Sequence, residues 1–305
     1  MVRNFDGVIA LAQKEATIRL AVAAAQDELV LQGVNLARKL NLVHPILVGD
    51  QTKIRKLVTQ HGLALGDSEI IDVKDETEAC YRSIELGLAG KADAVMKGGM
   101  DSAGFLRTVL DPKRGLRTER LVSCISLLED PNGERILYLT DAVVSISPNL
   151  EEKVKIIENA VAFLKVMGIS RPRVAALSAV ELITPNMPST IDAACLSKMS
   201  ERGQIKDAIV DGPFALDNVL SLEAARKKGI KSPLVGGADV LLAPNIETAN
   251  AIYKLLVYLA NYKGIGVFVG TKVQTIQLPR ESPPEAKLVG IATSILMINK
   301  MHMPL

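Results

Sequence analysis

Two short loops place carboxylates and amides directly after apolar runs. The run Ala208–Val210 is followed by Asp211-Gly212-Pro213, and the run Ala238–Leu242 is followed by Ala243-Pro244-Asn245. An apolar run that stops in this way is typical of a buried parallel strand, and ligands of open α/β sheets bind at the carboxyl edge of such strands. Turn chemistry alone is the alternative reading of each loop. Because both loops end apolar runs, we favour a site, with further polar side chains available from Asp217, Asn245, Glu247 and Asn250.

Lys97-Gly98-Gly99 is a candidate seat for an anion. The tripeptide follows the apolar segment Ala92–Met96 and precedes a helical pattern that begins near Ser102. A lysine at the end of a strand, glycines with exposed backbone N–H groups and a helix N-terminus together attract phosphate. Arg107 lies five residues into that helix and can project near the same edge. The alternative is a surface lysine and an ordinary turn.

A second cationic candidate is Arg280, which lies in Pro279-Arg280-Glu281-Ser282-Pro283-Pro284 between the last predicted strand and the last predicted helix. The prolines restrict this loop and would hold the guanidinium in a fixed place. An exposed loop arginine without a role is the alternative.

Several kinds of chemistry are excluded or disfavoured by the sequence. There is no G-x-x-x-x-G-K-[ST] motif, no G-x-S-x-G motif, and Gly264-Ile265-Gly266 lacks the third glycine of a dinucleotide fingerprint. The histidines, His44, His61 and His302, are far apart, which argues against a histidine-ligated metal or a histidine-based triad. The remaining glycines, carboxylates, amides and basic residues suit an anionic substrate that supplies its own nucleophile.

Composition limits the class of protein. A chain of 305 residues favours two domains. A formal charge of +2, no Trp, five Tyr and five Phe argue against a nucleic-acid partner. Cys80, Cys124 and Cys195 form no C-x-x-C pair, which fits a reducing cytoplasm, and Cys195 is expected in a core. We read neither a signal peptide nor an apolar run of about 18 residues, so we expect no membrane partner.

The order of the predicted elements indicates an α/β fold. Strand-like and helix-like segments alternate up to Leu110, with Asp50 as a helix N-cap, and this pattern predicts a parallel sheet covered on both faces. The pattern breaks around Asp111–Arg120, where we expect a domain boundary. The runs Leu121–Leu128 and Arg135–Leu139 then predict a hairpin, and Asn149 with Glu152 predicts a capping box that opens a long helix.

Several motifs resemble the phosphate butyryltransferase and phosphate acetyltransferase family from about residue 5 to residue 295. They are Ala21–Glu28, Met96-Lys97-Gly98, Phe105–Leu110, Gly115–Thr118, Leu139–Ala142, Met187–Ala194, Ile209–Asp217 and Pro244–Asn250. The resemblance implies a two-domain α/β fold like that of isocitrate and isopropylmalate dehydrogenases, with parallel-sheet domains and an active site in the cleft between them. It implies a first domain of residues 1–115 plus 276–305, and an inserted, dimer-forming second domain of residues 116–275.

The resemblance also implies a reaction, in which acyl-CoA and inorganic phosphate give acyl phosphate and CoA without a tightly bound cofactor or a metal. Arg280 and Arg107 match arginines that hold phosphate, CoA or developing charge, and Glu285 joins them as a candidate catalytic residue. The candidate substrate-binding residues are Lys97, Gly98, Ser102, Ser189, Thr190, Asp211, Gly212, Pro213, Asp217 and Asn250.

The chain departs from the family pattern beside Arg280. The family has a serine before the arginine, and this chain has Pro279, which lacks both hydroxyl and N–H. The family's acidic residue after the arginine is Ser282 here, although Glu281 stands beside it. We therefore expect a phosphate acyltransferase with reduced activity. The alternatives are a catalytically impaired acyl-CoA or phosphate-ester binding protein on the same fold, and a dehydrogenase of the related fold, which the missing dinucleotide fingerprint disfavours.

A homodimer is expected for a separate reason. The apolar segments Val122–Leu128 and Ile136–Leu139 of the predicted hairpin would form an exposed edge in a monomer.

Overall fold

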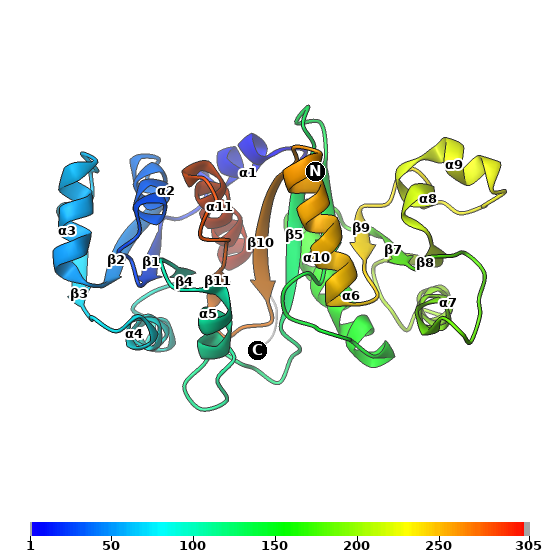
Figure 1. Cartoon of the computed structure of the whole chain (residues 1–305), viewed down its shortest axis with the longest axis horizontal. Coiled ribbons are helices and arrows are strands. Elements are labelled where there is room, and N and C mark those ends of the chain that lie inside the picture. Colours follow the sequence, from blue (N-terminus) through cyan, green and yellow to red (C-terminus); the bar gives the residue numbers. More distant parts are fainter. Residues whose placement is uncertain (1, 302–305) are drawn as a thin grey trace. The chain divides into compact units, whose positions relative to one another are not determined.

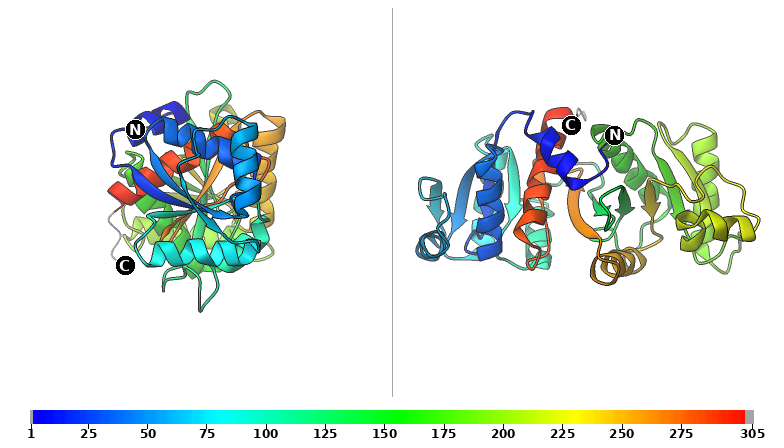
Figure 2. Two further views of the ribbon diagram at one scale, coloured as in Figure 1. Left: turned by 90° about the vertical axis from the view of Figure 1, so that its left-hand side faces the viewer. Right: turned by 90° about the horizontal axis from the view of Figure 1, so that it is seen from above.

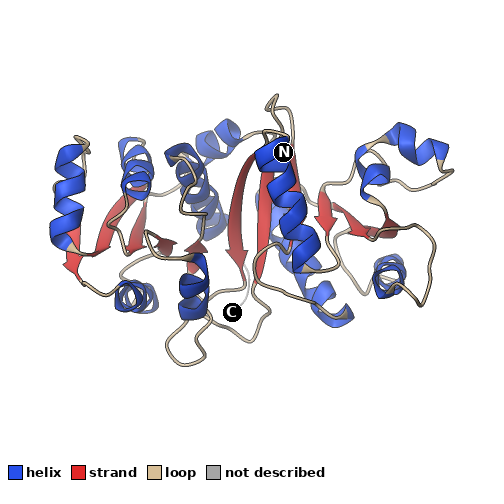
Figure 3. Cartoon of the chain, viewed as in Figure 1, coloured by secondary structure: helices blue, strands red, loops and turns tan. Residues whose placement is uncertain are grey.

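The computed structural model describes residues 2–301 and divides into two compact units. Unit 1 consists of Met1–Asn4 and Ser123–Gly264, and unit 2 consists of Phe5–Val122 and Ile265–Leu305. Each unit has strands flanked by helices (Figure 3). Among the described residues, no helix combines the length and apolar character needed to cross a membrane.

The units differ from the predicted domains at their boundaries. Residues 116–122 and 265–275, which we assigned to the second domain, lie in unit 2. Hydrogen bonds explain this placement, because Thr118 Oγ1 donates to Gly270 O at 2.9 Å and Lys272 N donates to Leu116 O at 2.9 Å. The two segments therefore hold each other within one unit.

Unit 2 is a twisted sheet with the strand order β3-β2-β1-β4-β11-β10. All neighbouring strands are parallel except β10 and β11, which pair antiparallel. Its strands are β1 (Ile18–Ala23), β2 (Val43–Gly49), β3 (Glu69–Asp72), β4 (Ala94–Lys97), β10 (Lys263–Val269, entering from unit 1) and β11 (Gln274–Ile276). Its helices are α1 (Phe5–Ala12), α2 (Glu28–Lys39), α3 (Gln51–Gln60), α4 (Glu76–Leu88), α5 (Ser102–Val109) and α11 (Pro284–Lys300).

Helices cover both faces of the unit 2 sheet, as predicted from the alternating pattern. Figure 1 shows α2, α3 and α11 on one face and α4 and α5 on the other. α11 packs against both α1 and α2 (Figure 2). Aspartates begin most of these helices, and the predicted cap at Asp50 is confirmed, since its Oδ1 accepts from Lys53 N at 3.1 Å.

Unit 1 has the strand order β5-β6-β9-β7-β8, with β5 and β6 antiparallel and the other pairs parallel. Its strands are β5 (Ser123–Glu129), β6 (Ile136–Thr140), β7 (Arg173–Leu177), β8 (Ile209–Phe214) and β9 (Val240–Leu242). Its helices are α6 (Leu150–Val166), α7 (Pro188–Glu201), α8 (Leu216–Leu220), α9 (Leu222–Lys227), α10 (Ile246–Lys254) and the π-helix η1 (Leu255–Leu259). In Figure 1, α7 and the pair α8 and α9 lie on opposite sides of β7 and β8.

The predicted hairpin and capping box in unit 1 are confirmed. β5 and β6 pair from Ser126↔Leu139 to Glu129↔Ile136, and Asn149 exchanges hydrogen bonds with Glu152 at the start of α6. The premise of our dimer argument is wrong, however, because every residue of β5 and β6 is buried within the chain. These strands expose no apolar edge for a second copy to cover.

Candidate functional site

Three loops leave the same edge of the unit 2 sheet. β1, β4 and β11 are parallel and in register, with Ala23 opposite Lys97 and Met96 opposite Ile276. The segments that follow them, residues 24–27, 98–101 and 277–283, therefore emerge side by side at the carboxyl edge. This is the edge where open α/β sheets bind ligands.

The glycines after β4 serve a different purpose from the one predicted. Gly98 N donates to Ala23 O and Gly99 N donates to Ala24 O, both at 2.8 Å. These amides are thus unavailable to an anion, and the predicted phosphate seat built from their N–H groups is wrong. Glycine is needed for close approach, since a Cβ at Gly98 would lie 2.3 Å from the carbonyl oxygens of Ala23 and Ala24.

Lys97 lies beneath these loops, where it does not face solvent. Its exposed fraction is 3%, and Nζ donates to Met100 O at 2.9 Å and Gly98 O at 3.2 Å. Burial lowers the pKa of Lys97, with Asp27 opposing that shift. Lys97 therefore stiffens the loop after β4. Its ammonium group also contributes positive potential to this edge of the sheet.

Arg280 occupies the loop after β11 and faces outward. Its Nε lies 3.2 Å from Oδ2 of Asp27, and 65% of its side chain remains exposed. Asp27 is itself fixed, because its Oδ1 accepts from Val30 N at 3.1 Å as the N-cap of α2. The ion pair orients the guanidinium and leaves most of it free to meet an anion. Asp27 belongs to the family motif Ala21–Glu28 but was not among the predicted site residues.

Ser102 and Arg107 lie on α5 beside the same edge. Ser102 Oγ accepts from Gln277 Nε2 at 2.9 Å, which connects α5 to the segment before Arg280. Arg107 is exposed in the last turn of α5 and lowers the pKa of Asp101, although backbone hydrogen bonding from Gly104 is the larger cause. Glu285 is exposed in the first turn of α11, where a carboxylate complements the helix dipole.

Lys287 of α11 is a buried cation that the sequence analysis missed. Only 1% of it is exposed, and Nζ donates to Ser282 O at 2.7 Å and to Arg280 O at 3.3 Å. Burial lowers its pKa to about 8; Lys97 acts in the same direction, whereas Asp27 and Glu281 oppose the shift. The sequence around it could have indicated it, because Lys287 directly precedes the apolar run Leu288–Ala292 in a helix that is buried all round.

The lowered pKa of Lys287 predicts a pH-dependent stability. Between pH 8 and its ordinary value of 10.5 the unfolded state binds more protons at this group than the folded state, so the free energy of unfolding rises with pH. Lys287→Met removes this contribution together with the buried charge. We expect the stability of the wild type relative to this variant to increase as pH rises above about 8, as measured by urea unfolding. A difference that stays constant with pH would contradict the assignment.

In unit 1, Asp211-Gly212-Pro213 lies inside a strand and does not end it. β8 continues to Phe214, which corrects the predicted strand end. The Asp211 carboxylate accepts from Ser197 Oγ at 2.9 Å and from Ser232 Oγ at 2.6 Å, so it joins α7 to the loop before β9. Gly212 is needed for close packing, because a Cβ there would lie 2.5 Å from Ala176 O.

The other predicted residues of unit 1 are mainly engaged within the unit. Thr190 is fully buried, and its hydroxyl donates to the carbonyl oxygens of Thr184 and Met187. Ser189 Oγ lies 2.9 Å from Ser178 Oγ and stays partly accessible. Asp217 pairs with Lys228 at 2.9 Å, which lowers the pKa of this exposed carboxyl. Of these three residues, Ser189 is the one best placed to touch a substrate.

Asn250 lies in α10 and contacts the loop that follows β6 at the carboxyl edge of unit 1. Its Nδ2 donates to Ala142 O at 3.3 Å. The loop that carries Ala142 is held by Asp141, whose buried carboxylate accepts four backbone N–H groups, from Cys124, Val143, Val144 and Ser145. Burial raises the pKa of Asp141 against these donors. Asp141 is a third residue that the site prediction left out, after Asp27 and Lys287.

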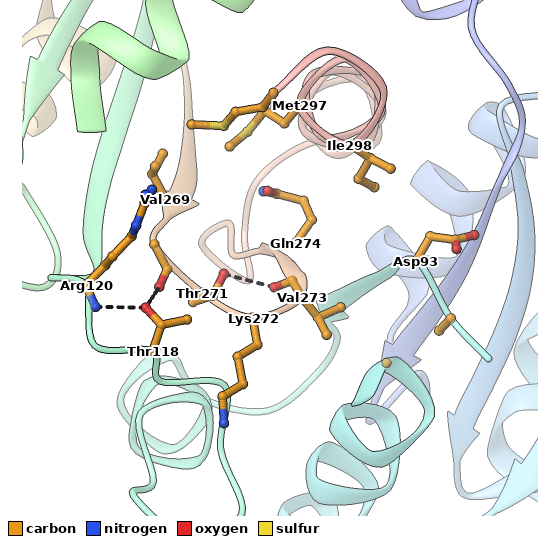
Figure 4. Close-up of a pocket in the computed structure, with 14 residues that line it drawn as sticks. Asp93, Thr118, Arg120, Val269, Thr271, Lys272, Val273, Gln274, Met297 and Ile298 are labelled. Atoms are coloured by element: carbon orange, nitrogen blue, oxygen red, sulfur yellow. Dashed lines mark hydrogen bonds between the residues drawn. The ribbon is translucent and has the colours of Figure 1, made fainter. Parts of the chain in front are cut away.

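One cavity lies away from the predicted site residues, and a second, smaller one lies beside one of them. One of about 340 Å³ lies in unit 2 at the amino edge of β4 and β11, between Asp93, Gln274 and Met297 (Figure 4). No predicted site residue lines it, and it lies at the sheet edge opposite Lys97. A much smaller cavity in unit 1 lies at the carboxyl ends of β7 and β9 and includes Ser189.

The chemistry available at the carboxyl edge of unit 2 is electrostatic. Arg280 pairs with Asp27, whose charge also acts on the buried Lys97 and Lys287, and the described part of this edge has no cysteine or histidine to act as a nucleophile. Such a cluster can orient an anionic reactant and stabilise a developing negative charge. An α/β protein with this edge fits an anion-handling enzyme whose substrate supplies the attacking atom.

Comparison with known proteins identifies the family. Residues 77–280 match the family model described as phosphate acetyl/butaryl transferase. The chain is 43% identical to phosphate butyryltransferase of Clostridium beijerinckii over 97% of this chain and 98% of that protein. The chain therefore belongs to the phosphate acetyl/butyryl transferase family, as the sequence motifs predicted.

Solved structures confirm the predicted fold class. A branched-chain phosphotransacylase from Enterococcus faecalis superimposes with a TM-score of 0.79 at 26% identity, covering 94% of this chain and 100% of that chain. A 4-hydroxythreonine-4-phosphate dehydrogenase from Burkholderia phymatum, 15% identical, has a TM-score of 0.51 and covers 91% of this chain and 98% of that chain. The second comparison shows only that the fold is shared with a dehydrogenase.

Proposed function

We propose that this protein transfers a short-chain acyl group between CoA and inorganic phosphate. The observation that carries the proposal is the outward-facing Arg280, fixed by Asp27 above two buried lysines, in a chain of the phosphate acetyl/butyryl transferase family. Acyl-CoA, CoA, phosphate and acyl phosphate are the proposed partners, and no tightly bound cofactor is proposed.

In the proposed reaction a phosphate oxygen attacks the thioester carbonyl carbon. The new C–O bond gives a tetrahedral intermediate, whose collapse breaks the C–S bond and releases CoA as a thiolate that takes up a proton. Phosphate is an anion at neutral pH, so no side-chain nucleophile is required. Alignment of the two substrates and stabilisation of the oxyanion are the tasks left to the protein.

The exposure of each cationic side chain indicates its proposed role in the reaction. Arg280 contacts phosphate or the developing oxyanion, because its planar guanidinium has several accessible donors. Arg107 holds a phosphate group of a substrate from α5. Lys97 and Lys287 act on this site through their charge. The acyl group is left as acetyl, butyryl or a similar short chain, in keeping with the two acyl groups in the family's description.

The test is thiol release from butyryl-CoA with and without phosphate. We expect release to depend on phosphate and to saturate with it. Thiol release at the same rate without phosphate would indicate a hydrolase, and no release with either butyryl-CoA or acetyl-CoA would favour the binding-protein alternative.

A homodimer is part of the proposal, although its surface is not the hairpin. The π-helix η1 exposes three large apolar side chains, with Tyr258 64% and Leu259 74% exposed beside Leu255. We propose that a second copy covers them, because clustered exposed apolar side chains often mark an interface. Light scattering should give a dimer that Leu259→Glu weakens. A monomeric wild type at micromolar concentration would contradict this.

We propose a cytoplasmic location. The three cysteines are free thiols, and Cys80 and Cys124 are buried, which suits a reducing compartment.

A further inference from the structure

Lys287 occupies a position that is unfavourable for a buried cation. It lies in the first turns of α11, where the helix dipole repels positive charge, and only 1% of it is exposed. The N-cap residue of the helix, Pro283, also makes no side-chain capping hydrogen bond. The contacts of Lys287 must therefore offset both the desolvation of the ammonium group and the helix dipole.

Those contacts are with the loop that carries Arg280. The Lys287 side chain runs back toward the helix N-terminus, as helical side chains do. Its Nζ donates to the carbonyl oxygens of Arg280, at 3.3 Å, and of Ser282, at 2.7 Å. The same turn is closed by Ser282 N donating to Pro279 O at 3.1 Å. Both ends of the Arg280–Ser282 segment are thus tied to one ammonium group.

Close packing keeps the lysine in this place. A Cβ at Gly33 of α2 would lie 2.6 Å from Cβ of Lys287 and 3.1 Å from Pro284 O, so α2 and α11 approach each other directly over the base of this side chain. Asp27, which orients the Arg280 guanidinium, is the N-cap of that same α2. The backbone and the side chain of Arg280 are therefore fixed from the same pair of helices.

We propose that Lys287 is a positioning residue that straps the Arg280 loop through its two carbonyl contacts and so holds the guanidinium in its working place. This proposal rests on the proposed acyl transfer, since it assigns Lys287 a task in that reaction. Lys287 itself touches no substrate. Its removal leaves two carbonyl groups without their donor and frees the loop to move.

Limited trypsin digestion tests the strap independently of activity, because Arg280 is itself a trypsin site and its carbonyl is one of the two that Lys287 binds. In the full chain, Lys287→Met should raise the rate of cleavage between Arg280 and Glu281 severalfold, relative to cleavage at other sites, as followed by mass spectrometry. Lys300→Met is the matched control on the same helix, where Lys300 pairs with Glu15 at 2.8 Å, and it should leave cleavage at Arg280 unchanged.

Kinetics then separate positioning from general stability. Lys287→Met should lower kcat for phosphate-dependent cleavage by about 10–10² and leave KM for acyl-CoA unchanged, because small misplacements of a catalytic group have effects of that size. Lys287→Arg, which keeps the charge and the donors, should recover part of the loss. Lys300→Met should behave as wild type.

The outcomes are distinct. Unchanged cleavage at Arg280 in a folded Lys287→Met variant would overturn the strap, and faster cleavage with unchanged kcat would overturn its role in the reaction. If Lys287→Met is cleaved everywhere because it does not fold, Lys287→Gln, which is too short to reach both carbonyls, takes its place with the same expectations. An inactive wild type would overturn the proposed function, while the digestion result would still decide the strap.

Discussion

Arg280→Ala is expected to lower kcat for phosphate-dependent thioester cleavage by about 10²–10³, the usual loss when one preorganised donor for a developing oxyanion is removed. The guanidinium is the most exposed cation of the cluster around Asp27, with 65% of its side chain accessible. Because its ion pair with Asp27 leaves most of the guanidinium in solvent, the loss of Arg280 should leave the melting temperature close to that of the wild type.

Two controls define the origin of that loss. Arg280→Lys keeps the charge but not the planar fork of donors, so it should recover only part of the activity. Arg55→Ala removes an exposed arginine from α3 and should have no effect on kcat.

Phosphate should also raise the melting temperature of the wild type by mass action, and Arg280→Ala should reduce that shift. A wild-type kcat in Arg280→Ala would show that Arg280 takes no part in the reaction.

The second large effect is expected from Pro279→Ser, which restores the serine of the family pattern. If that hydroxyl assists the thiolate or the oxyanion, kcat should rise about 10-fold or more with little change in KM, as expected for a transition-state interaction. The substitution preserves the Pro279 carbonyl that accepts from Ser282 N, so the turn should persist.

The double variant Pro279→Ser with Pro283→Ser is measured beside the single variant. The second substitution is included because Pro283 and Pro284 restrict the course of the loop. Pro283 is the N-cap of α11, so a serine there also adds a capping hydroxyl worth about 1 kcal/mol. Pro283→Ser alone is the control, and it should raise stability without raising kcat. If the unmodified protein already turns over at about 10 s⁻¹, Pro279 is no defect, and the hydroxyl of the buried Ser282 becomes the first alternative to test.

Much of the framework was predictable because it depends on local chemistry. Alternation of strand and helix patterns indicated the parallel sheets. The apolar runs Leu121–Leu128 and Arg135–Leu139 indicated the hairpin, and Asn149 with Glu152 indicated the capping box, and the structure contains both. The passage from α10 to the π-helix η1 at Leu255 was not predictable, because helical spacing does not distinguish the two forms.

The site was predicted less completely, for identifiable reasons. The sequence places Lys97-Gly98-Gly99 after a strand, but it does not reveal that the neighbouring strand approaches closely enough to take both glycine amides. It also cannot distinguish a carboxylate that binds a substrate from one that joins two loops, which is the role of Asp211. Arg280 could be proposed from the sequence because its motif is local. Lys287 was missed because a lysine in a helix is ordinarily read as exposed.

The most direct measurement of the central claim is the product. Butyryl-CoA, phosphate and the purified protein are incubated, and acyl phosphate is trapped with hydroxylamine while free thiol is measured in the same sample. The account predicts equal amounts of acyl phosphate and CoA thiol, both absent without phosphate and both reduced about 10²-fold or more in Arg280→Ala. Thiol release without acyl phosphate, or equal amounts of product from Arg280→Ala and wild type, would contradict it.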